Sequence, residues 1–181
     1  RWLAFLNNEH DFMERVPEEF ITQAAPGGKL APNLAKRGMQ AVFTLAPDMT
    51  FTCFNLDDPV VGGMAPDKIA LRRAIALAYD SVREIRIARR GQGEPAQSPL
   101  MPSTSGFDAA FKSEMGDYDP ARAKALLQMY GYVDKDGDGW RETPEGRPLV
   151  LRKMTQSGQT SRELDDLLRR DMKALGIRVE F

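Results

Sequence analysis

Acidic residues recur at regular spacing in one short stretch, DKDGDGW, which begins at Asp134 and continues as RETPE. Asp134, Asp136, Asp138, Gly139 and Glu145 fit the pattern D-x-D-x-D-G-x5-E. Carboxylate oxygens at this spacing can surround a calcium ion, and the glycine supplies the sharp turn that such a loop requires. The four acids are therefore candidate ligands for Ca²⁺, the one metal that the sequence suggests.

The residues after this loop decide between calcium binding and a simple turn. An EF-hand needs a helix on each side of its loop, because the paired helices hold the ligands. Pro144, Gly146 and Pro148 interrupt any outgoing helix, and residues 149–155 are typical of a strand. A turn in which Asp side chains bond their own backbone is the favoured interpretation, with a structural cation or a calcium switch as alternatives. We expect calcium binding to be weak or absent, and no cofactor to be required.

Residues able to do covalent or acid–base chemistry lack the partners that catalysis needs. The chain has one histidine and one cysteine, Cys53, and it contains no G-x-S-x-G, P-loop or G-x-G-x-x-G motif. The pairs Asp57-Asp58 and Asp165-Asp166 fall in a turn and on the polar face of a predicted helix, where acids are usually solvated. No base is placed to activate the thiol of Cys53. We therefore expect a binding module rather than an enzyme.

The overall composition is that of an ordinary globular protein. The 181 residues include 25 Lys and Arg against 26 Asp and Glu, which gives a formal net charge of −1. Strong attraction to nucleic acid or to an anionic membrane is therefore not expected. No apolar run approaches the roughly 18–20 residues of a membrane span, and a single cysteine excludes an internal disulfide.

Helices and strands alternate along the chain. Apolar residues at helical spacing predict helices over 66–90, 120–130 and 161–175, with Asp119 as the N-cap of the second. A shorter helix is expected at 17–25. Stretches rich in β-branched and aromatic residues predict strands at 11–16, 39–47, 49–56, 147–155 and 177–181. This order predicts an α/β or α+β fold, with a mixed sheet flanked by helices.

Four segments in a fixed order resemble a known lobe. They are FLNNEHDFMERVPEEF (5–20), FTCFNLDDPVVGGMAPDKIALRRAIALAYD (51–80), YDPARAKALLQMYGYVDKDGDGWRE (118–142) and LRKMTQSGQTSRELDDLLRRDMKALGIRV (151–179). Together they resemble the extracytoplasmic solute-binding proteins of ABC importers, in the peptide, dipeptide and nickel-binding family known as family 5. The resemblance covers nearly the whole chain.

The resemblance implies a fold and a role. It implies a periplasmic-binding-protein-like type II fold, of which residues 1–181 form a single lobe fragment, the C-terminal lobe, incomplete at its C-terminal end. Members capture a peptide or similar small solute outside the cytoplasm, in the periplasm, and deliver it to a membrane permease. They close two lobes over the ligand, so we expect this chain alone to bind peptide poorly or not at all. The family also has a strand–turn at the acidic stretch, which supports the turn interpretation.

The resemblance also implies ligand-facing positions. They lie at the end of the strand FTCFN, in the turn RRGQG and in the loop TQSGQT, and the candidate residues are Cys53, Asn55, Arg90, Ser157, Gln159 and Thr160. Arg90 keeps a basic residue that can meet a carboxylate. Cys53 departs from an acid and Thr160 from a histidine found in oligopeptide binders. The alternatives are a buried Cys53, a solvated Arg90, and an N-cap role for the loop before the last helix.

Other functions remain as alternatives. A structural calcium-binding module would use residues 134–145, and a hydrolase would use the carboxylates or Cys53. Within the family, the ligand can be a nickel chelate, heme, a sugar or an opine-like compound instead of a peptide. The single His10 gives no support to recognition of a chelated metal.

Overall fold

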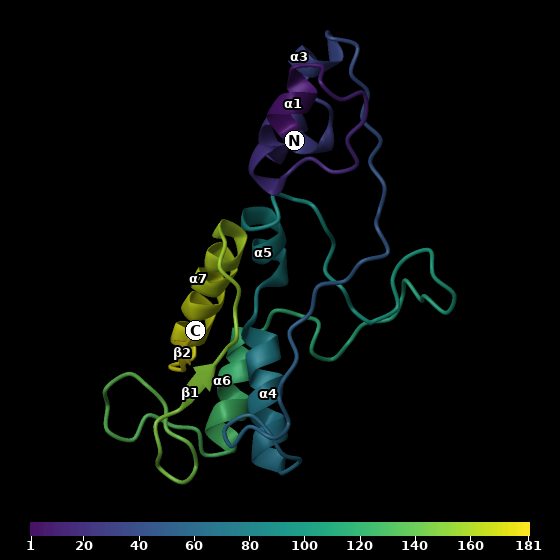
Figure 1. Ribbon diagram of the computed structural model, residues 1–181. Helices are drawn as coiled ribbons and strands as arrows, with labels where there is room; N and C mark the ends of the chain where they lie inside the picture. Colours follow the sequence, from purple (N-terminus) through teal and green to yellow (C-terminus); the bar gives the residue numbers. More distant parts are fainter.

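The computed structural model describes residues 1–181 and is elongated (Figure 1). Residues 1–39, here called the N-terminal cluster, fold into short helices at one end, and residues 54–181, here called the main body, form the larger part. The N-terminal cluster contains α1 (Trp2–Leu6), η1 (Glu18–Phe20), α2 (Ile21–Ala24), η2 (Pro26–Gly28) and α3 (Pro32–Ala35). The main body contains α4 (Pro66–Ala78), α5 (Ser81–Ile87), α6 (Pro120–Met129), β1 (Val150–Arg152), α7 (Gln159–Ala174) and β2 (Arg178–Glu180).

Helices α4 and α6 pack against each other through their apolar stripes. Leu71 and Leu77 of α4 and Leu127 of α6 are completely buried. Full burial of each such side chain contributes about 1.5–3 kcal/mol. Asp119 caps α6 as predicted, because its carboxylate accepts a hydrogen bond from the Arg122 backbone N–H at 2.9 Å. The helix pair therefore forms the centre of the main body.

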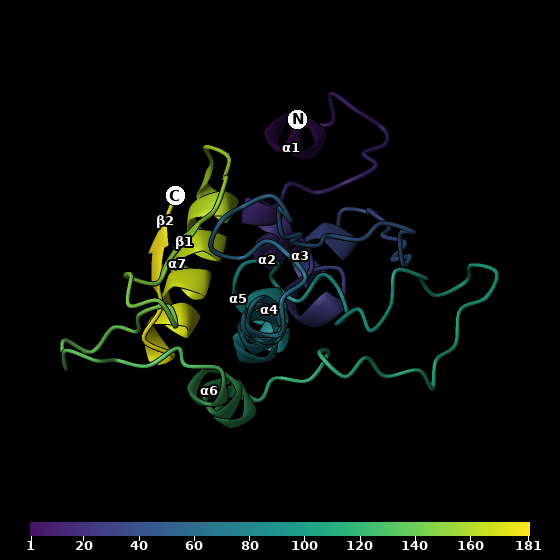
Figure 2. The ribbon, with the colours of Figure 1, turned by 90° about the horizontal axis from the view of Figure 1, so that it is seen from below.

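The C-terminal part of the main body is a strand–helix–strand unit. Strands β1 and β2 are parallel, with Leu151 opposite Val179, and α7 connects them and packs beside them (Figures 1 and 2). Met172 of α7 and Leu149 and Ile177 beside the strands are buried in the same core as α4 and α6. The predicted α/β class is confirmed, but the sheet has two strands and is smaller than expected.

The helix predicted over residues 66–90 is broken. Tyr79 has an extended backbone (φ −87°, ψ 117°), and it separates α4 from α5. Asp80 then acts as an N-cap, accepting a hydrogen bond from the Arg83 backbone N–H at 2.9 Å. An aspartate that can cap a helix start competes with helix continuation, which is the local reason for the break. The break sends α5 along α7 toward the N-terminal cluster (Figure 1).

Three predicted strands do not form. Residues 11–16, 39–47 and 49–56 have no strand partners, and the latter two run as an extended segment between the N-terminal cluster and α4 (Figure 1). Val42 is 87% exposed and Phe51 is 70% exposed. Their composition suits a strand, but a strand is stable only when another strand pairs with it. Within the main body, residues 91–118 form a loop that extends away from the helices (Figure 2).

The molecule has two separate hydrophobic cores. The smaller core lies within the N-terminal cluster, where Trp2, Ala24, Ala31 and Leu34 are buried together. The larger core belongs entirely to the main body. The two parts are linked by polar contacts, described below. No helix is both long and apolar enough to cross a bilayer.

Candidate ligand site

Three of the predicted ligand residues meet where α5 ends and α7 begins. Arg90, Gln159 and Thr160 line one small pocket of about 30 Å³. Its other lining residues are Glu18, Glu19, Ala88 and Glu163. Arg90 donates a hydrogen bond from Nη2 to Glu163 Oε1 at 2.8 Å, and Gln159 Nε2 donates to the same oxygen at 3.3 Å. The fold thus brings Arg90 to the same surface as Gln159 and Thr160, which follow it by 69 and 70 positions.

The backbone at the end of α5 directs Arg90 to this pocket. Arg90 has φ +53°, in the left-handed region that a residue with a side chain rarely adopts. The turn is held by Gly91, whose backbone N–H donates to Ile85 O at 2.8 Å. Gly91 also has a positive φ of +80°, which glycine adopts without steric cost. The Arg90 guanidinium therefore points at the first turn of α7.

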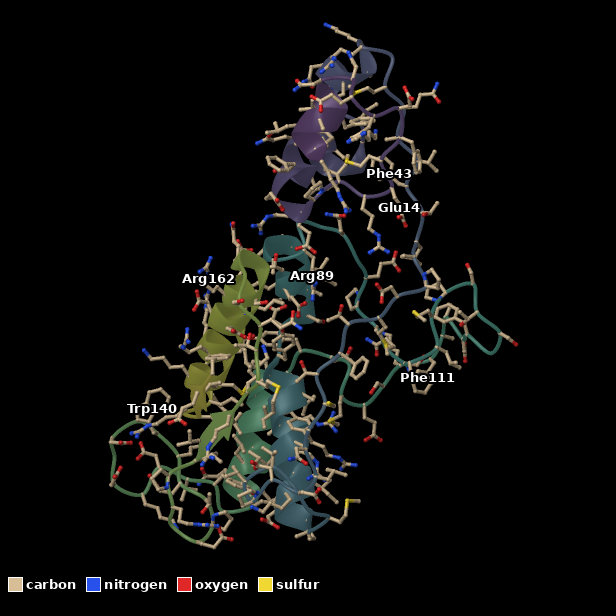
Figure 3. All side chains as sticks on the ribbon, in the orientation of Figure 1. Glu14, Phe43, Arg89, Phe111, Trp140 and Arg162 are labelled. Carbon is tan, nitrogen blue, oxygen red and sulfur yellow. The ribbon has the colours of Figure 1, made fainter.

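Polar contacts beside this pocket join the N-terminal cluster to the main body. Thr160 Oγ1 donates a hydrogen bond to Glu18 Oε2 at 2.8 Å, and Arg89 Nη1 lies 4.0 Å from Glu18 Oε1. Figure 3 shows Arg89 just after α5 and Arg162 on α7, at the end of the main body that faces the N-terminal cluster. We call this contact region the polar joint; it comprises Glu18, Glu19, Arg89, Arg90, Gln159, Thr160 and Glu163. Polar contacts of this kind permit the two parts to move relative to each other more easily than an apolar interface.

Charge pairing dominates the electrostatics of the polar joint. The hydrogen bond from Arg90 lowers the pKa of Glu163 below its usual value, and the same bond raises the pKa of Arg90. Both side chains are about a quarter exposed, at 27% for Arg90 and 26% for Glu163. The other oxygen, Glu163 Oε2, is buried and has no hydrogen-bond partner. The positive charge of Arg90 is thus already matched within the chain.

The remaining predicted ligand residues lie outside this pocket. Cys53 is exposed, because the strand expected to bury it does not form. Asn55 Oδ1 accepts a hydrogen bond from the Asp57 backbone N–H at 3.1 Å and so shapes a turn. Ser157 is exposed in the bend before α7. None of these three residues lines the pocket that contains Arg90.

Three acids in the pocket, Glu18, Glu19 and Glu163, were missed by sequence reasoning. Glu163 lies four residues after Gln159 on one helix, so helical spacing alone places it on the same face. Glu18 belongs to η1, more than a hundred residues earlier, and no local pattern connects it with α7. Only the folded chain brings Glu18 and Thr160 together.

The arrangement can hold a small polar group but has no group placed for covalent chemistry. The family model for bacterial extracellular solute-binding proteins, family 5 middle, matches residues 1–181. The chain belongs to this family.

Two relatives of the chain bind small solutes. Di/tripeptide-binding protein 2 of Pseudomonas aeruginosa (strain UCBPP-PA14) is 31% identical over 115 residues, covering 64% of this chain and 20% of that protein. NikA from Brucella suis, solved in complex with Fe(III)-EDTA, is 25% identical with a TM-score of 0.54, covering 62% of this chain and 22% of that one. The chain thus spans about a fifth of the length of each of these relatives.

A third comparison concerns the fold. The periplasmic oligopeptide-binding protein of an oligopeptide ABC transporter from Thermotoga maritima is 22% identical with a TM-score of 0.55. The match covers 99% of this chain and 38% of that one. The predicted type II periplasmic-binding-protein-like fold is confirmed by this likeness.

The acidic loop of this family 5 chain is a turn stabilised by its own backbone. Asp134 accepts hydrogen bonds from the backbone N–H groups of Gly137 at 2.8 Å and Gly139 at 2.9 Å. Asp138 accepts one from the Trp140 N–H at 2.8 Å. No helix follows the loop; the next regular element is β1. The outgoing half of an EF-hand is therefore missing, as the sequence predicted.

The carboxylates that lie together in this loop differ from the predicted set. Oxygens of Asp134, Asp136, Asp138 and Glu142 lie within 4.8 Å of one another. Glu145, the predicted fourth ligand, is not in this group and instead lies 3.7 Å from Arg147. The reason is a tight turn, in which the Gly146 N–H donates to Thr143 O at 2.8 Å. Whether a cation binds there stays a prediction, and calcium binding is expected to be weak.

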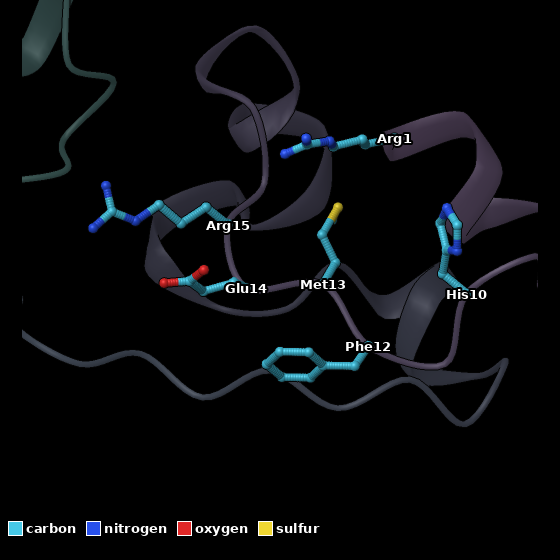
Figure 4. Close-up of a pocket in the computed structure, with 6 residues that line it drawn as sticks. All are labelled: Arg1, His10, Phe12, Met13, Glu14 and Arg15. Atoms are coloured by element: carbon cyan, nitrogen blue, oxygen red, sulfur yellow. The ribbon is translucent and has the colours of Figure 1, made fainter.

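A larger hollow lies in the N-terminal cluster, away from these residues. It has a volume of about 390 Å³ and is lined by Arg1, His10, Phe12, Met13, Glu14 and Arg15. Figure 4 shows Arg1 at the start of α1 and the other five side chains spread along residues 10–15, with Glu14 and Arg15 on the side away from His10. No set of polar groups converges in it, so the polar joint remains the candidate site.

Proposed function

We propose that the protein containing this chain captures a peptide or similar small solute outside the cytoplasm and delivers it, unaltered, to the membrane permease of an ABC importer. The observation that carries the proposal is the family match over residues 1–181. The di/tripeptide-binding relative supports a short peptide as the ligand. The chain spans a fifth of that relative, so the identity of the solute and the interaction with a permease are both proposed for the whole protein.

The polar joint supports a role on one side of a closing site. Arg90, Gln159 and Thr160 present a guanidinium, an amide and a hydroxyl at one surface, and these groups suit the backbone and charged ends of a peptide. Peptide side chains can then face hydrated space, so that water compensates for their variety. Half of such a site holds ligand weakly, because binding energy comes from both lobes.

The test begins with native mass spectrometry of the full-length protein purified from its host. We expect a bound small mass whose fragmentation gives short peptides. Calorimetry with trialanine should then show binding, weakened in Thr160→Ala, whereas Fe(III)-EDTA should give no heat. Ser103→Ala, in the extended loop, is the control variant. Saturable binding of Fe(III)-EDTA without binding of any peptide would refute a peptide ligand.

A further inference from the structure

One oxygen of Glu163 is engaged and the other is not. Oε1 accepts hydrogen bonds from Arg90 at 2.8 Å and from Gln159 at 3.3 Å. Oε2 is buried, has no hydrogen-bond partner, and belongs to a residue that lines the pocket. An unpaired buried carboxylate oxygen carries a desolvation penalty, which a donor placed against it would remove.

The pocket carries more negative than positive charge. Glu18, Glu19 and Glu163 supply three carboxylates against the one guanidinium of Arg90, a difference of two negative charges. Arg89, just outside the pocket, lies 3.2 Å from Glu84 and only 4.0 Å from Glu18, so its charge is shared with another acid. A ligand group entering the pocket therefore meets acceptors and a guanidinium that is already paired.

We propose that Glu163 determines the charge preference of this site: by holding Arg90, it turns a position suited to a ligand carboxylate into one that takes a cationic nitrogen. This inference rests on the proposed function. The pocket of about 30 Å³ fits such a group, since a single water needs about 10–15 Å³. A protonated amine there is attracted by the carboxylates of Glu163 and Glu18.

The experiment compares three probes on the full-length protein: trialanine, trialanine amide, which lacks the carboxylate, and N-acetyl-trialanine, which lacks the cation. Calorimetry gives the ratio of the dissociation constants for the last two probes. Glu163→Gln keeps the shape but removes the charge that holds Arg90. The ratio should shift about tenfold in favour of N-acetyl-trialanine, the low end for a hydrogen bond to a charged group at a partly exposed site.

Two further variants make the result decisive. Glu163→Ala should shift the ratio in the same direction, so the inference survives if one variant folds poorly. Asp166→Asn removes an equal charge from the same helix, where the side chain is 74% exposed, and should leave the ratio unchanged within about twofold. Wild-type binding with no shift in either Glu163 variant, or an equal shift in Asp166→Asn, would overturn the inference. If wild-type protein binds none of the probes, the proposed peptide function is refuted and the charge preference falls with it.

Discussion

The ion pair between Arg83 and Asp171 fixes α5 against α7, and its removal should destabilise the main body. Asp171 is 4% exposed and Arg83 is 15% exposed in their side chains. The Asp171 carboxylate accepts hydrogen bonds from the Arg83 guanidinium and from the Asp80 backbone N–H, the latter at 3.3 Å. Burial raises the pKa of Asp171, so the cost of desolvation outweighs the attraction of Arg83.

The magnitude follows from what Asp171→Ala leaves behind. The Arg83 guanidinium stays buried, its Nε already lacks a partner, and only the Asp80 carboxylate remains near, at 3.5 Å. Breaking a buried pair costs about 3–5 kcal/mol, and Asp80 offsets part of this, so we expect a loss of about 3 kcal/mol in the free energy of unfolding. The double variant Arg83→Met/Asp171→Leu removes both charges and should lie within about 1 kcal/mol of wild type.

Urea denaturation followed by circular dichroism at the helical minimum measures both quantities. Asp166→Ala, on the exposed face of α7, is the control and should change stability by less than about 0.5 kcal/mol. The reasoning is wrong if Asp171→Ala is as stable as this control. It is also wrong if the double variant loses as much as the single one, because packing rather than charge would then explain the loss.

Three further predictions concern the core, pH and calcium. Leu127→Ala, at a fully buried position, should lower the free energy of unfolding by about 3–5 kcal/mol. Amide hydrogen exchange should become faster within residues 66–179, while residues 2–34 keep their protection. An equal loss of protection in both regions would contradict the presence of two separate cores. The lowered pKa of Glu163 means that its pairing with Arg90 contributes stability above the unfolded carboxyl pKa of about 4.3 and loses it as pH falls through the folded value. An NMR titration of this carboxyl should therefore give a midpoint below that of an unfolded peptide, and a midpoint above it would refute the pairing. Calorimetric titration of the metal-free chain with calcium should show weak or no binding, because Asp134 already accepts two backbone N–H groups; submicromolar affinity abolished by Asp134→Asn would reverse this.

Local signals carried the sequence prediction well. The spacing of Leu71 and Leu127 with their neighbours, the N-cap at Asp119, and the prolines around Pro144 each act within a few residues. Helices α4, α6 and α7, both strands and the turn at the acidic loop therefore follow from the sequence, since one element contains the whole signal.

Features that depend on residues far apart in the chain could not be predicted from the sequence. Residues 39–56 have strand composition, but composition cannot supply the neighbouring strand that pairing needs. The contact of the start of α5 with α7, in which the Asp171 carboxylate accepts the Asp80 N–H, joins residues 91 positions apart. Glu18 reaches the candidate site only through the packing of the N-terminal cluster against the main body. Such contacts are absent from any local pattern.

The left-handed backbone of Arg90 limits how this site can diversify. A β-branched residue at that position would meet strong steric opposition, at a cost on the order of 1–3 kcal/mol. Position 163, in the regular part of α7, accepts most side chains without backbone strain. A substitution at position 163 therefore changes the charge beside Arg90 without straining the backbone, whereas at position 90 only residues suited to the left-handed region, such as glycine or asparagine, avoid that strain.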